Sequence, residues 1–326
     1  MKIGVIGAGH LGQFHLNQLS ETPEWNLIGL FDSDNNRASE MAAKHSITAF
    51  ETIDALLDKV DVVDIVTPTL SHFEIAAKAI QKGKHVFIEK PVTNTVEEAE
   101  KLIELSKEFN VKVQVGHIER FNPAFKAAVN SISSPQFIET HRLAQFNPRG
   151  NDVSVVLDLM IHDLDIILST VKSPISNISA SGVSVISDTP DIANARIEFE
   201  DGCVANLTAS RISMKNMRKS RFFQKDAYVS VDFFEKKSEI IQMKPVDENT
   251  SEFAIIFDPG NNKEKKEILF NSPNVTESNA IKDELLSFYE SIANNTECVV
   301  TIHDAYAALK TAHAILDRIG HKTISA

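Results

Sequence analysis

An apolar stretch of the chain, VVLDLMIHDLDIIL at residues 155–168, carries four ionisable side chains. A carboxylate that is buried without a partner is strongly destabilising, so such groups normally have a partner or a chemical role. Asp158, His162 and Asp165 follow the spacing i, i+4 and i+7, which places them on one face of a helix, whereas Asp163 points elsewhere. The stretch predicts a mostly buried helix whose polar face looks into either a hydrogen-bond network or a ligand cleft.

Proton transfer is the chemistry that these residue types support. A histidine can be neutral at physiological pH and accept a proton from a hydroxyl group, and a carboxylate one helical turn away can orient it. Two alternatives stay open at this point: the side chains could form a satisfied buried network, or they could ligate zinc or iron. Because neither a third histidine nor an H-E-x-x-H pattern lies nearby, the sequence predicts no metal site.

The start of the chain has the pattern of a dinucleotide-binding loop. A short β-branched run, KIGVI, is followed by Gly7, Gly9 and Gly12 in the phase G-x-G-x-x-G and then by a helical pattern. Gly7 permits the tight turn, Gly9 lets a pyrophosphate approach closely, and Gly12 lets the helix pack on the strand. The positive end of the helix, with His10 and Leu11, favours the phosphate charge, so both residues are predicted cofactor contacts.

A second strand, WNLIGLF, ends at Asp32, about 20 residues after the last glycine, where a ribose-binding carboxylate is expected. A carboxylate there accepts hydrogen bonds from the ribose hydroxyls and repels a 2′-phosphate. The sequence therefore favours NAD over NADP as the cofactor. Arg37 leaves NADP open as the less favoured alternative, because a nearby arginine can accommodate that phosphate.

Strand-like and helical patterns then alternate as far as the run KVQVGH, which predicts a doubly wound parallel sheet of the α/β Rossmann class. Ligands of such sheets bind at the carboxyl ends of the strands. Further cofactor contacts are accordingly predicted at Thr67, Pro68, His72, Glu89 and Lys90.

The pattern changes after GHIERFNPAF. Strand-like runs such as QFIETHRLAQF and ISNISASGVSV follow, and Glu-Asp-Gly in ANARIEFEDGCVANLTAS predicts a hairpin turn. These runs predict a C-terminal α+β domain with an open, mostly antiparallel sheet. The expected boundaries are 1–118 for the dinucleotide-binding Rossmann domain, 119–300 for the α+β domain, and 301–326 for a C-terminal helix that packs back on the Rossmann domain.

With the strand end IEKPV and the helix pattern D-x-x-x-H-x-x-D in DLMIHDLD, the whole chain resembles the glucose-fructose oxidoreductase, inositol dehydrogenase and MocA family. The resemblance implies a Rossmann domain followed by an α+β domain, and hydride transfer between a secondary alcohol of a sugar or cyclitol and nicotinamide. It implies a catalytic set of Lys90, Asp158 and His162, and a cis bond between Lys90 and Pro91. Whether Lys90 or His162 is the base stays open.

The substrate is predicted less sharply. HIERFNPA and DLMIHDLDIIL are similar to the family branch that oxidises C3 of UDP-N-acetylglucosamine, and the basic run KNMRKSR at 215–221 is either a solvated loop or a receptor for a diphosphate. A free sugar or inositol dehydrogenase and a non-catalytic NAD(H)-binding sensor are the alternatives. The candidate substrate contacts are His117, Arg120, Asn122, Arg142, Asp158 and His162.

Composition limits the class of protein. The 326 residues suggest two domains, and a net charge of −12 argues against nucleic acid as a partner. No apolar run reaches the roughly 20 residues of a membrane span, and no signal-peptide pattern opens the chain. Two cysteines, Cys203 and Cys298, suggest a reducing compartment. We expect a cytoplasmic homodimer or homotetramer that associates through the C-terminal sheet, since an open sheet needs cover.

Overall fold

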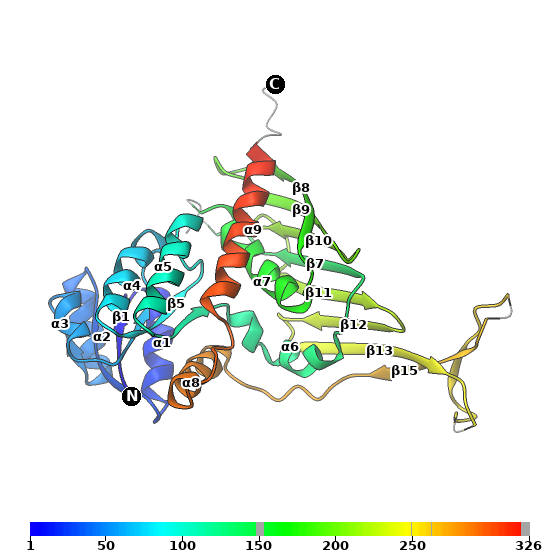
Figure 1. The fold of residues 1–326 in the computed structure, drawn as a ribbon, viewed down its shortest axis with the longest axis horizontal. Coiled ribbons are helices and arrows are strands. Elements are labelled where there is room, and N and C mark those ends of the chain that lie inside the picture. Colours follow the sequence, from blue (N-terminus) through cyan, green and yellow to red (C-terminus); the bar gives the residue numbers. More distant parts are fainter. Residues whose placement is uncertain (148–152, 249, 262, 321–326) are drawn as a thin grey trace. The chain divides into compact units, whose positions relative to one another are not determined.

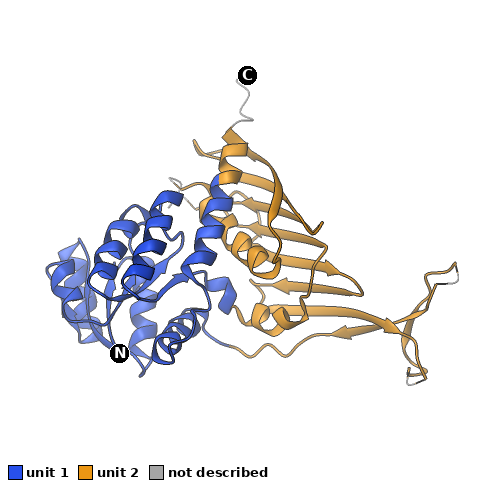
Figure 2. Cartoon of the chain, viewed as in Figure 1, with its two compact units in different colours: residues 1–121, 278–313 blue, residues 122–277, 314–326 orange. Residues whose placement is uncertain are grey.

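The computed structural model describes residues 1–147, 153–248, 250–261 and 263–320 (Figure 1). The chain divides into two compact units, coloured separately in Figure 2. Unit 1 contains residues 1–121 and 278–313, and unit 2 contains residues 122–277 and the chain from 314 onward. Each unit has its own sheet.

Unit 1 is built on a six-stranded parallel sheet in the order β3-β2-β1-β4-β5-β6. The central strands are buried along nearly their whole length, as expected for a parallel sheet with helices on both faces. The strand order reverses direction between β1 and β4, which is where such sheets bind ligands. The strands are β1 Lys2–Ile6, β2 Asn26–Phe31, β3 Thr48–Ala49, β4 Val62–Ile65, β5 His85–Glu89 and β6 Val113–Gly116.

The helices of unit 1 begin at residues suited to cap them. Asp34 caps α2 and Thr52 caps α3, while Thr95 and Glu98 form a reciprocal capping box at the start of α5. Helix α1 contacts α2 and α8, and α4 contacts α5. The helical segments are α1 His10–Ser20, α2 Asn35–His45, α3 Ile53–Leu57, η1 Thr69–Ser71, α4 His72–Gln81, α5 Val96–Glu108, η2 Ile118–Phe121 and α8 Ala280–Ala293, together with the first part of α9 Ile302–Gly320.

The position of α8 differs from the expected domain boundary at residue 300. Leu285 and Phe288 of α8 are buried in the same core as β1 and α1, and the indole of Trp25 donates a hydrogen bond to the carbonyl of Leu285 at 3.2 Å. The helix therefore belongs to unit 1, although the chain between residues 122 and 277 lies in the other unit. In the first part of α9 the hydroxyl of Tyr306 donates to Glu100 of α5 at 2.6 Å.

Unit 2 is built on a nine-stranded sheet in the order β14-β15-β13-β12-β11-β7-β10-β9-β8. Strands β7 and β10 pair in parallel, and the other neighbouring pairs are antiparallel. The predicted hairpin joins β9 to β10, with Gly202 at φ +87°. The strands are β7 Phe137–Leu143, β8 Ile175–Val183, β9 Ile192–Phe199, β10 Val204–Ser210, β11 Met217–Gln224, β12 Ala227–Asp232, β13 Lys237–Pro245, β14 Ile255–Phe257 and β15 Lys266–Asn271.

Short helices pack on this sheet and include the polar stretch singled out in the sequence. Helix α6 contacts β12 and β13, and α7 contacts β7; both helices are labelled in Figure 1. The turn η4 contacts β10. The expected single helix over 155–168 is a π-helical turn, η4 Val156–Met160, that continues into α7 Ile161–Thr170. The remaining helical segments of unit 2 are α6 Pro123–Ala128 and η3 Val129–Ser131.

Two further features differ from the sequence expectations. The basic run at 215–221 is not a loop throughout, because its residues from Met217 onward form part of β11. Helix α2, Asn35–His45, was not among the expected elements. Among the described residues, no helix is both long and apolar enough to cross a membrane.

Candidate active site

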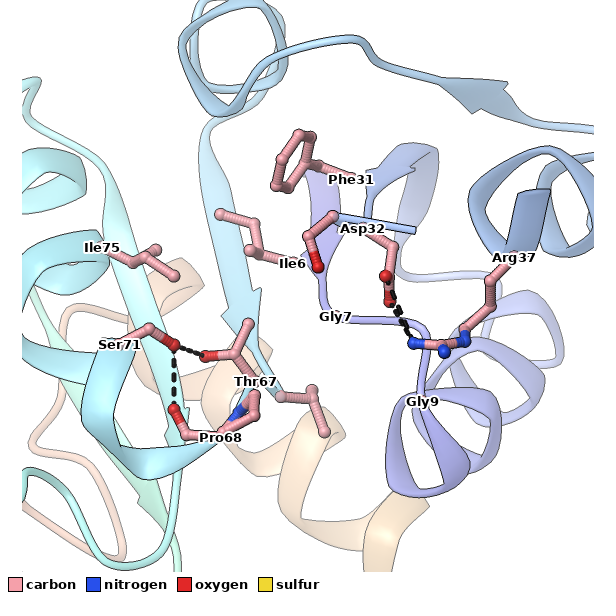
Figure 3. Close-up of a pocket in the computed structure, with 12 residues that line it drawn as sticks. Ile6, Gly7, Gly9, Phe31, Asp32, Arg37, Thr67, Pro68, Ser71 and Ile75 are labelled. Carbon is pink, nitrogen blue, oxygen red and sulfur yellow. Dashed lines mark hydrogen bonds and ion pairs between the residues drawn. The ribbon is translucent and has the colours of Figure 1, made fainter. Parts of the chain in front are cut away.

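A cavity of about 390 Å³ opens at the carboxyl ends of β1, β2 and β4 in unit 1 (Figure 3). Its position between β1 and β4 is the reversal point of the strand order. Ile6, Val66 and Ile75 give it apolar walls suited to a flat aromatic base. The full lining is Ile6, Gly7, Gly9, Phe31, Asp32, Ser33, Arg37, Val66, Thr67, Pro68, Ser71 and Ile75.

The glycine loop has the geometry that its sequence predicts. Gly7 has φ +100°, and a Cβ there would lie 2.6 Å from the carbonyl oxygen of Val66. A Cβ on Gly12 would lie 2.1 Å from the carbonyl oxygen of Gly7, so helix and strand meet too closely for a side chain. A Cβ on Gly9, in contrast, would meet no described atom within 4 Å. The loop thus leaves open space only at the glycine predicted to face a pyrophosphate.

The start of α1 is suited to an anion. Within the part of the chain that the structure describes, no side chain caps this helix, so its first amide groups remain available to a ligand. His10 and Leu11 are exposed in this first turn, and the imidazole of His10 packs edge-on against Phe14 at 5.2 Å. The residues present therefore fit the pyrophosphate of a dinucleotide.

Asp32 is held rigidly at the cavity. One carboxylate oxygen accepts the amide of Ala8 at 2.7 Å, and the other accepts the amide of Asp34 at 2.8 Å. The guanidinium of Arg37 lies 3.3 Å from Asp32 and 3.2 Å from the carboxylate of Asp34. Arg37, which the sequence left as a possible partner of a 2′-phosphate, is thus paired with two carboxylates. Figure 3 shows its contact with Asp32.

Replacing Asp32 by alanine is expected to raise the ratio of NADP to NAD activity roughly tenfold or more. The change removes a charged hydrogen-bond acceptor, worth about 1.5–3 kcal/mol, and frees the guanidinium of Arg37 for a 2′-phosphate. Steady-state kcat/KM with each cofactor measures the ratio. Asp34→Asn, which weakens the second partner of Arg37 but keeps Asp32, is the control. An unchanged ratio in Asp32→Ala would mean that the ribose contact lies elsewhere.

A buried histidine, His72, contacts the segments that follow β4 and β5. The ring nitrogens of His72 lie 2.8 Å from the carbonyl oxygen of Thr67 and 3.0 Å from that of Pro91. Burial lowers the pKa of His72. The bond between Lys90 and Pro91 is cis, as the family resemblance implied. His72 therefore ties the two strand ends together, and it is not among the residues that line the described cavity.

Glu89 and Lys90 follow one another at the end of β5 but have different surroundings. Lys90 is half-buried, whereas Glu89 is 7% exposed and lies against the buried His15 at 3.2 Å. The second carboxylate oxygen of Glu89 accepts the amide of Lys90 at 3.1 Å. Glu89 was predicted to contact the cofactor; its carboxylate contacts these protein groups, and it does not line the described cavity.

The predicted substrate residues of HIERFNPA are spread over both units. His117 is buried, and Arg120 lies 3.8 Å from Asp304, all within unit 1. Asn122 begins unit 2, where its side chain accepts the amide of Ala124 and donates to the carbonyl of Phe233 at 3.1 Å. Asn122 thus caps helix α6, and both the oxygen and the nitrogen of its side-chain amide form hydrogen bonds within the protein. This structural role argues against the prediction that Asn122 binds substrate.

The polar stretch of η4 and α7 separates into an outer and an inner pair. Asp158 and His162 are half-buried, whereas Asp163 and Asp165 are each 1% exposed. The π-helical turn between Val156 and Met160 shifts the faces that a uniform helical period predicts, and such turns are frequent at functional sites. Asp158 and His162 are thus the members of the stretch with access to a ligand.

Arg142 pairs with Asp163, the residue of the polar stretch that points away from its polar face. Its Nε and Nη2 atoms each donate to a different carboxylate oxygen of Asp163 at 3.0 Å, and both side chains are almost fully buried. A buried carboxylate needs such a partner, so the pair explains why Asp163 occurs in an apolar stretch. Arg142 was predicted to bind substrate, whereas its burial and its pairing with Asp163 favour a structural role.

The sequence analysis did not single out three buried ionisable residues of unit 1. His15, Asp64 and Glu284 are 0% exposed. His15 and Glu284 lie close to Glu89, and Asp64 contacts His15. Asp64 carried a signal, because it interrupts the apolar strand VVDI. Of the predicted catalytic residues, Lys90 lies in unit 1, and Asp158 and His162 lie in unit 2.

Comparison with known proteins agrees with this architecture. Residues 1–117 match the family model "Oxidoreductase family, NAD-binding Rossmann fold", and residues 130–224 match "GFO/IDH/MocA C-terminal domain". The chain is 43% identical over 234 residues to UDP-N-acetylglucosamine 3-dehydrogenase of Acidithiobacillus ferrooxidans, covering 72% of this chain and 74% of that protein. It is 31% identical over 234 residues to scyllo-inositol 2-dehydrogenase (NAD(+)) of Bacillus subtilis, covering 65% and 68%.

Solved structures extend the similarity to nearly the whole chain. The structure of the Acidithiobacillus ferrooxidans enzyme superposes with a TM-score of 0.89 at 35% identity and covers 98% of both chains. Levoglucosan dehydrogenase in complex with NADH and L-sorbose has a TM-score of 0.83 at 18% identity, covering 98% of this chain and 97% of that one, which shows a shared fold. Since family models match parts of both units, the chain is an enzyme of the GFO/IDH/MocA family, an oxidoreductase that binds NAD.

Proposed function

We propose that this oxidoreductase oxidises the C3 hydroxyl of UDP-N-acetylglucosamine to a 3-keto sugar with NAD as the acceptor. The observation that carries the proposal is the similarity to UDP-N-acetylglucosamine 3-dehydrogenase over 98% of both chains. Relatives named as inositol dehydrogenases match a smaller part of this chain at lower identity, such as 31% over 65%. They favour a cyclitol as the second candidate substrate.

The cavity of unit 1 supports the cofactor part of the proposal. Asp32 accepts hydrogen bonds from the ribose hydroxyls, while the uncapped start of α1 and the open space at Gly9 hold the pyrophosphate. The pairing of Arg37 with Asp32 and Asp34 leaves this cation less available to a 2′-phosphate. NAD, when bound, supplies the nicotinamide that takes up the hydride.

The proton of the oxidised hydroxyl requires a separate acceptor. In our proposal a neutral His162 accepts it, and the half-buried Asp158 of the preceding turn orients the imidazole. The ammonium group of Lys90 stabilises the negative charge that develops on the substrate oxygen. The reverse assignment, with a neutral Lys90 as the base, uses the same residues and differs in the pH dependence of turnover.

The basic run at 215–221 is a candidate binding site for the diphosphate of the substrate, but its cations have different surroundings. Arg221 donates to Glu139 of the neighbouring strand β7 at 2.7 Å and is therefore already neutralised. Lys215 and Arg218 are exposed, and Lys219 is half-buried. We propose Lys215 and Lys219 as the candidate phosphate contacts, and a purely solvated role is the alternative.

Absorbance of NADH during incubation of the purified protein with NAD and one candidate alcohol tests the proposal. Reduction is expected with UDP-N-acetylglucosamine and not with free hexoses or inositols. Reduction only with a free polyol would overturn the substrate and retain the reaction class. No reduction with any of them, under conditions where NADH binding is detected by fluorescence, would favour a non-catalytic sensor over the proposed enzyme.

We further infer that the protein is a homodimer or homotetramer. The face of the large sheet that carries Phe223 holds an aromatic cluster, in which this ring lies 5.8 Å from Phe137 and 5.0 Å from Tyr228. An open sheet face with apolar groups is stabilised by a second copy of the chain. Light scattering after gel filtration measures the state, and a monomer would contradict the inference.

A cytoplasmic location is also a proposal. Cys203 and Cys298 are both free thiols. Burial raises the pKa of each to about 11, so both remain protonated and slow to oxidise. A protein with this pair of isolated thiols suits a reducing compartment. Fractionation of the native cells would test the location.

A further inference from the structure

Four ionisable side chains from four different elements of unit 1 meet in its interior. They are His15 of α1, Asp64 of β4, Glu89 of β5 and Glu284 of α8. His15, Asp64 and Glu284 are 0% exposed, and Glu89 is 7% exposed. A cluster of this kind is costly to bury, so its members must be paired or protonated. The reaction proposed above uses none of these side chains.

Both ring nitrogens of His15 face carboxylate oxygens. Nδ1 lies 2.9 Å from Oδ2 of Asp64, and Nε2 lies 3.2 Å from Oε1 of Glu89. The contact of Nδ1 is a hydrogen bond, whereas that of Nε2 is an ion-pair approach outside hydrogen-bond geometry. Two acidic groups on opposite sides of the ring favour its protonated form. Burial lowers the pKa of His15, but the charges and hydrogen bonds of Asp64 and Glu89 outweigh burial and raise it well above the ordinary value. His15 is therefore an imidazolium between two carboxylates.

We infer that Glu284 is protonated, because it is buried without a hydrogen-bonding partner for its charged form. Neither of its carboxyl oxygens has a hydrogen-bond partner among the described residues, and one lies within 4.8 Å of the ligand atoms of His15 and Glu89. Burial and the negative charge of Glu89 raise the pKa of Glu284 well above the ordinary value. Burial raises the pKa of Asp64 as well, and its contact with His15 opposes that rise. We infer that the cluster holds an imidazolium that faces Asp64 and Glu89, and a neutral carboxylic acid at Glu284.

The cluster reaches the predicted catalytic lysine through Glu89. One carboxylate oxygen of Glu89 faces His15, and the other accepts the amide of Lys90 at 3.1 Å. A Cβ on Gly116 of the neighbouring strand would lie 2.7 Å from the first oxygen, so the carboxylate fits tightly against β6. The orientation of the peptide that carries Lys90 therefore depends on a carboxylate whose other oxygen is held by His15.

We propose that His15 is a positioning residue: clamped between Asp64 and Glu89, it fixes the strand end that presents Lys90 and joins it to α1, the helix of the glycine loop. This proposal rests on the catalytic role proposed for Lys90. A bound metal is the competing explanation, since imidazole and carboxylates are common ligands. A metal needs the lone pair of Nε2, whereas a ring protonated between Asp64 and Glu89 has none to offer.

Nuclear magnetic resonance of the whole protein labelled with 15N-histidine tests the charge of His15 directly. Both ring nitrogens are expected to stay at imidazolium shifts at pH values above the ordinary titration range of histidine. His15→Gln assigns the signals by their loss. Neutral-tautomer shifts at neutral pH, or a stoichiometric metal ion detected by elemental analysis, would overturn the proposal.

Kinetics test the positioning role. His15→Gln is expected to lower kcat at least about tenfold, because a small displacement of a reacting group is costly, while the Kd of NADH changes little. His45→Gln, a histidine of α2 outside the cluster, is the control. Unchanged kcat in His15→Gln, together with a large loss in Lys90→Met, would refute positioning and spare the proposed function. Unchanged turnover in Lys90→Met would refute the role of Lys90 instead.

Glu284→Gln tests the cluster even if His15→Gln does not fold. The unfolded glutamate releases its proton near 4.5, whereas the native one keeps it to higher pH. The native state then binds more protons, so the stability of the wild type falls as pH rises above about 5. Glutamine removes this effect, while His15, Asp64, Glu89 and Lys90 remain in both proteins. The gain in Tm of Glu284→Gln over wild type is expected to grow between about pH 5 and pH 8. A constant difference would contradict the assigned protonation.

Discussion

Replacing Lys90 by methionine is expected to lower kcat at least about a hundredfold, the usual contribution of a group that takes part in proton transfer or stabilises its charge. Methionine keeps an unbranched side chain of similar length and removes the ammonium group. Lys90 is half-buried at the end of β5, the strand next to β4, and the segment that follows β4 lines the cavity. Stopped-flow or steady-state reduction of NAD with the active alcohol provides the measurement.

Two controls separate chemistry from binding and folding in this experiment. Lys59→Met removes an exposed lysine of the same unit and should leave kcat within about twofold of the wild type. NADH binding by Lys90→Met, followed by fluorescence, should remain close to the wild-type Kd. If Lys90→Met turns over at the wild-type rate, Lys90 has no part in the reaction, and the base must be sought at His162 alone.

Replacing Arg142 by methionine is expected to reduce the free energy of unfolding by about 3–5 kcal/mol, the typical loss when one member of a buried ion pair is removed. The exposed fractions of the Arg142 and Asp163 side chains are 3% and 2%, so the abandoned carboxylate stays out of water. Urea unfolding at constant m-value measures the change.

The exposed pair of Arg196 and Glu198 on β9 is the matched control. Its N–O distance is also 3.0 Å, but the two side chains are 45% and 39% exposed. Arg196→Met should therefore cost less than about 1 kcal/mol. The double variant Arg142→Met, Asp163→Leu should recover much of the loss, since it leaves no buried charge. Equal, small losses in the two arginine variants, with a raised KM for the sugar in Arg142→Met, would restore the substrate role.

The short-range features of the cofactor site were determined by the sequence alone. The spacing of Gly7, Gly9 and Gly12 and the place of Asp32 at a strand end predicted the loop and cavity that the structure contains. Such features follow from neighbours a few residues apart, because strand and helix periods and turn preferences are local properties. The hairpin of β9 and β10 followed from Glu-Asp-Gly for the same reason.

The pairing of ionisable residues was decided only by the tertiary structure. The sequence showed that the carboxylates of residues 155–168 need partners, but Arg142 lies 21 residues from Asp163 and reaches it from another element. Helix α8 packs beside Trp25 across 260 residues of sequence, and it brings Glu284 to His15 and Glu89. Contacts between residues so far apart in sequence depend on how helices and strands pack and on which charged groups are buried together. The periodicity of a single helix or strand does not predict them. The sequence therefore determined the types of chemistry available to this chain. The fold decided which ionisable side chains pair with one another inside the protein.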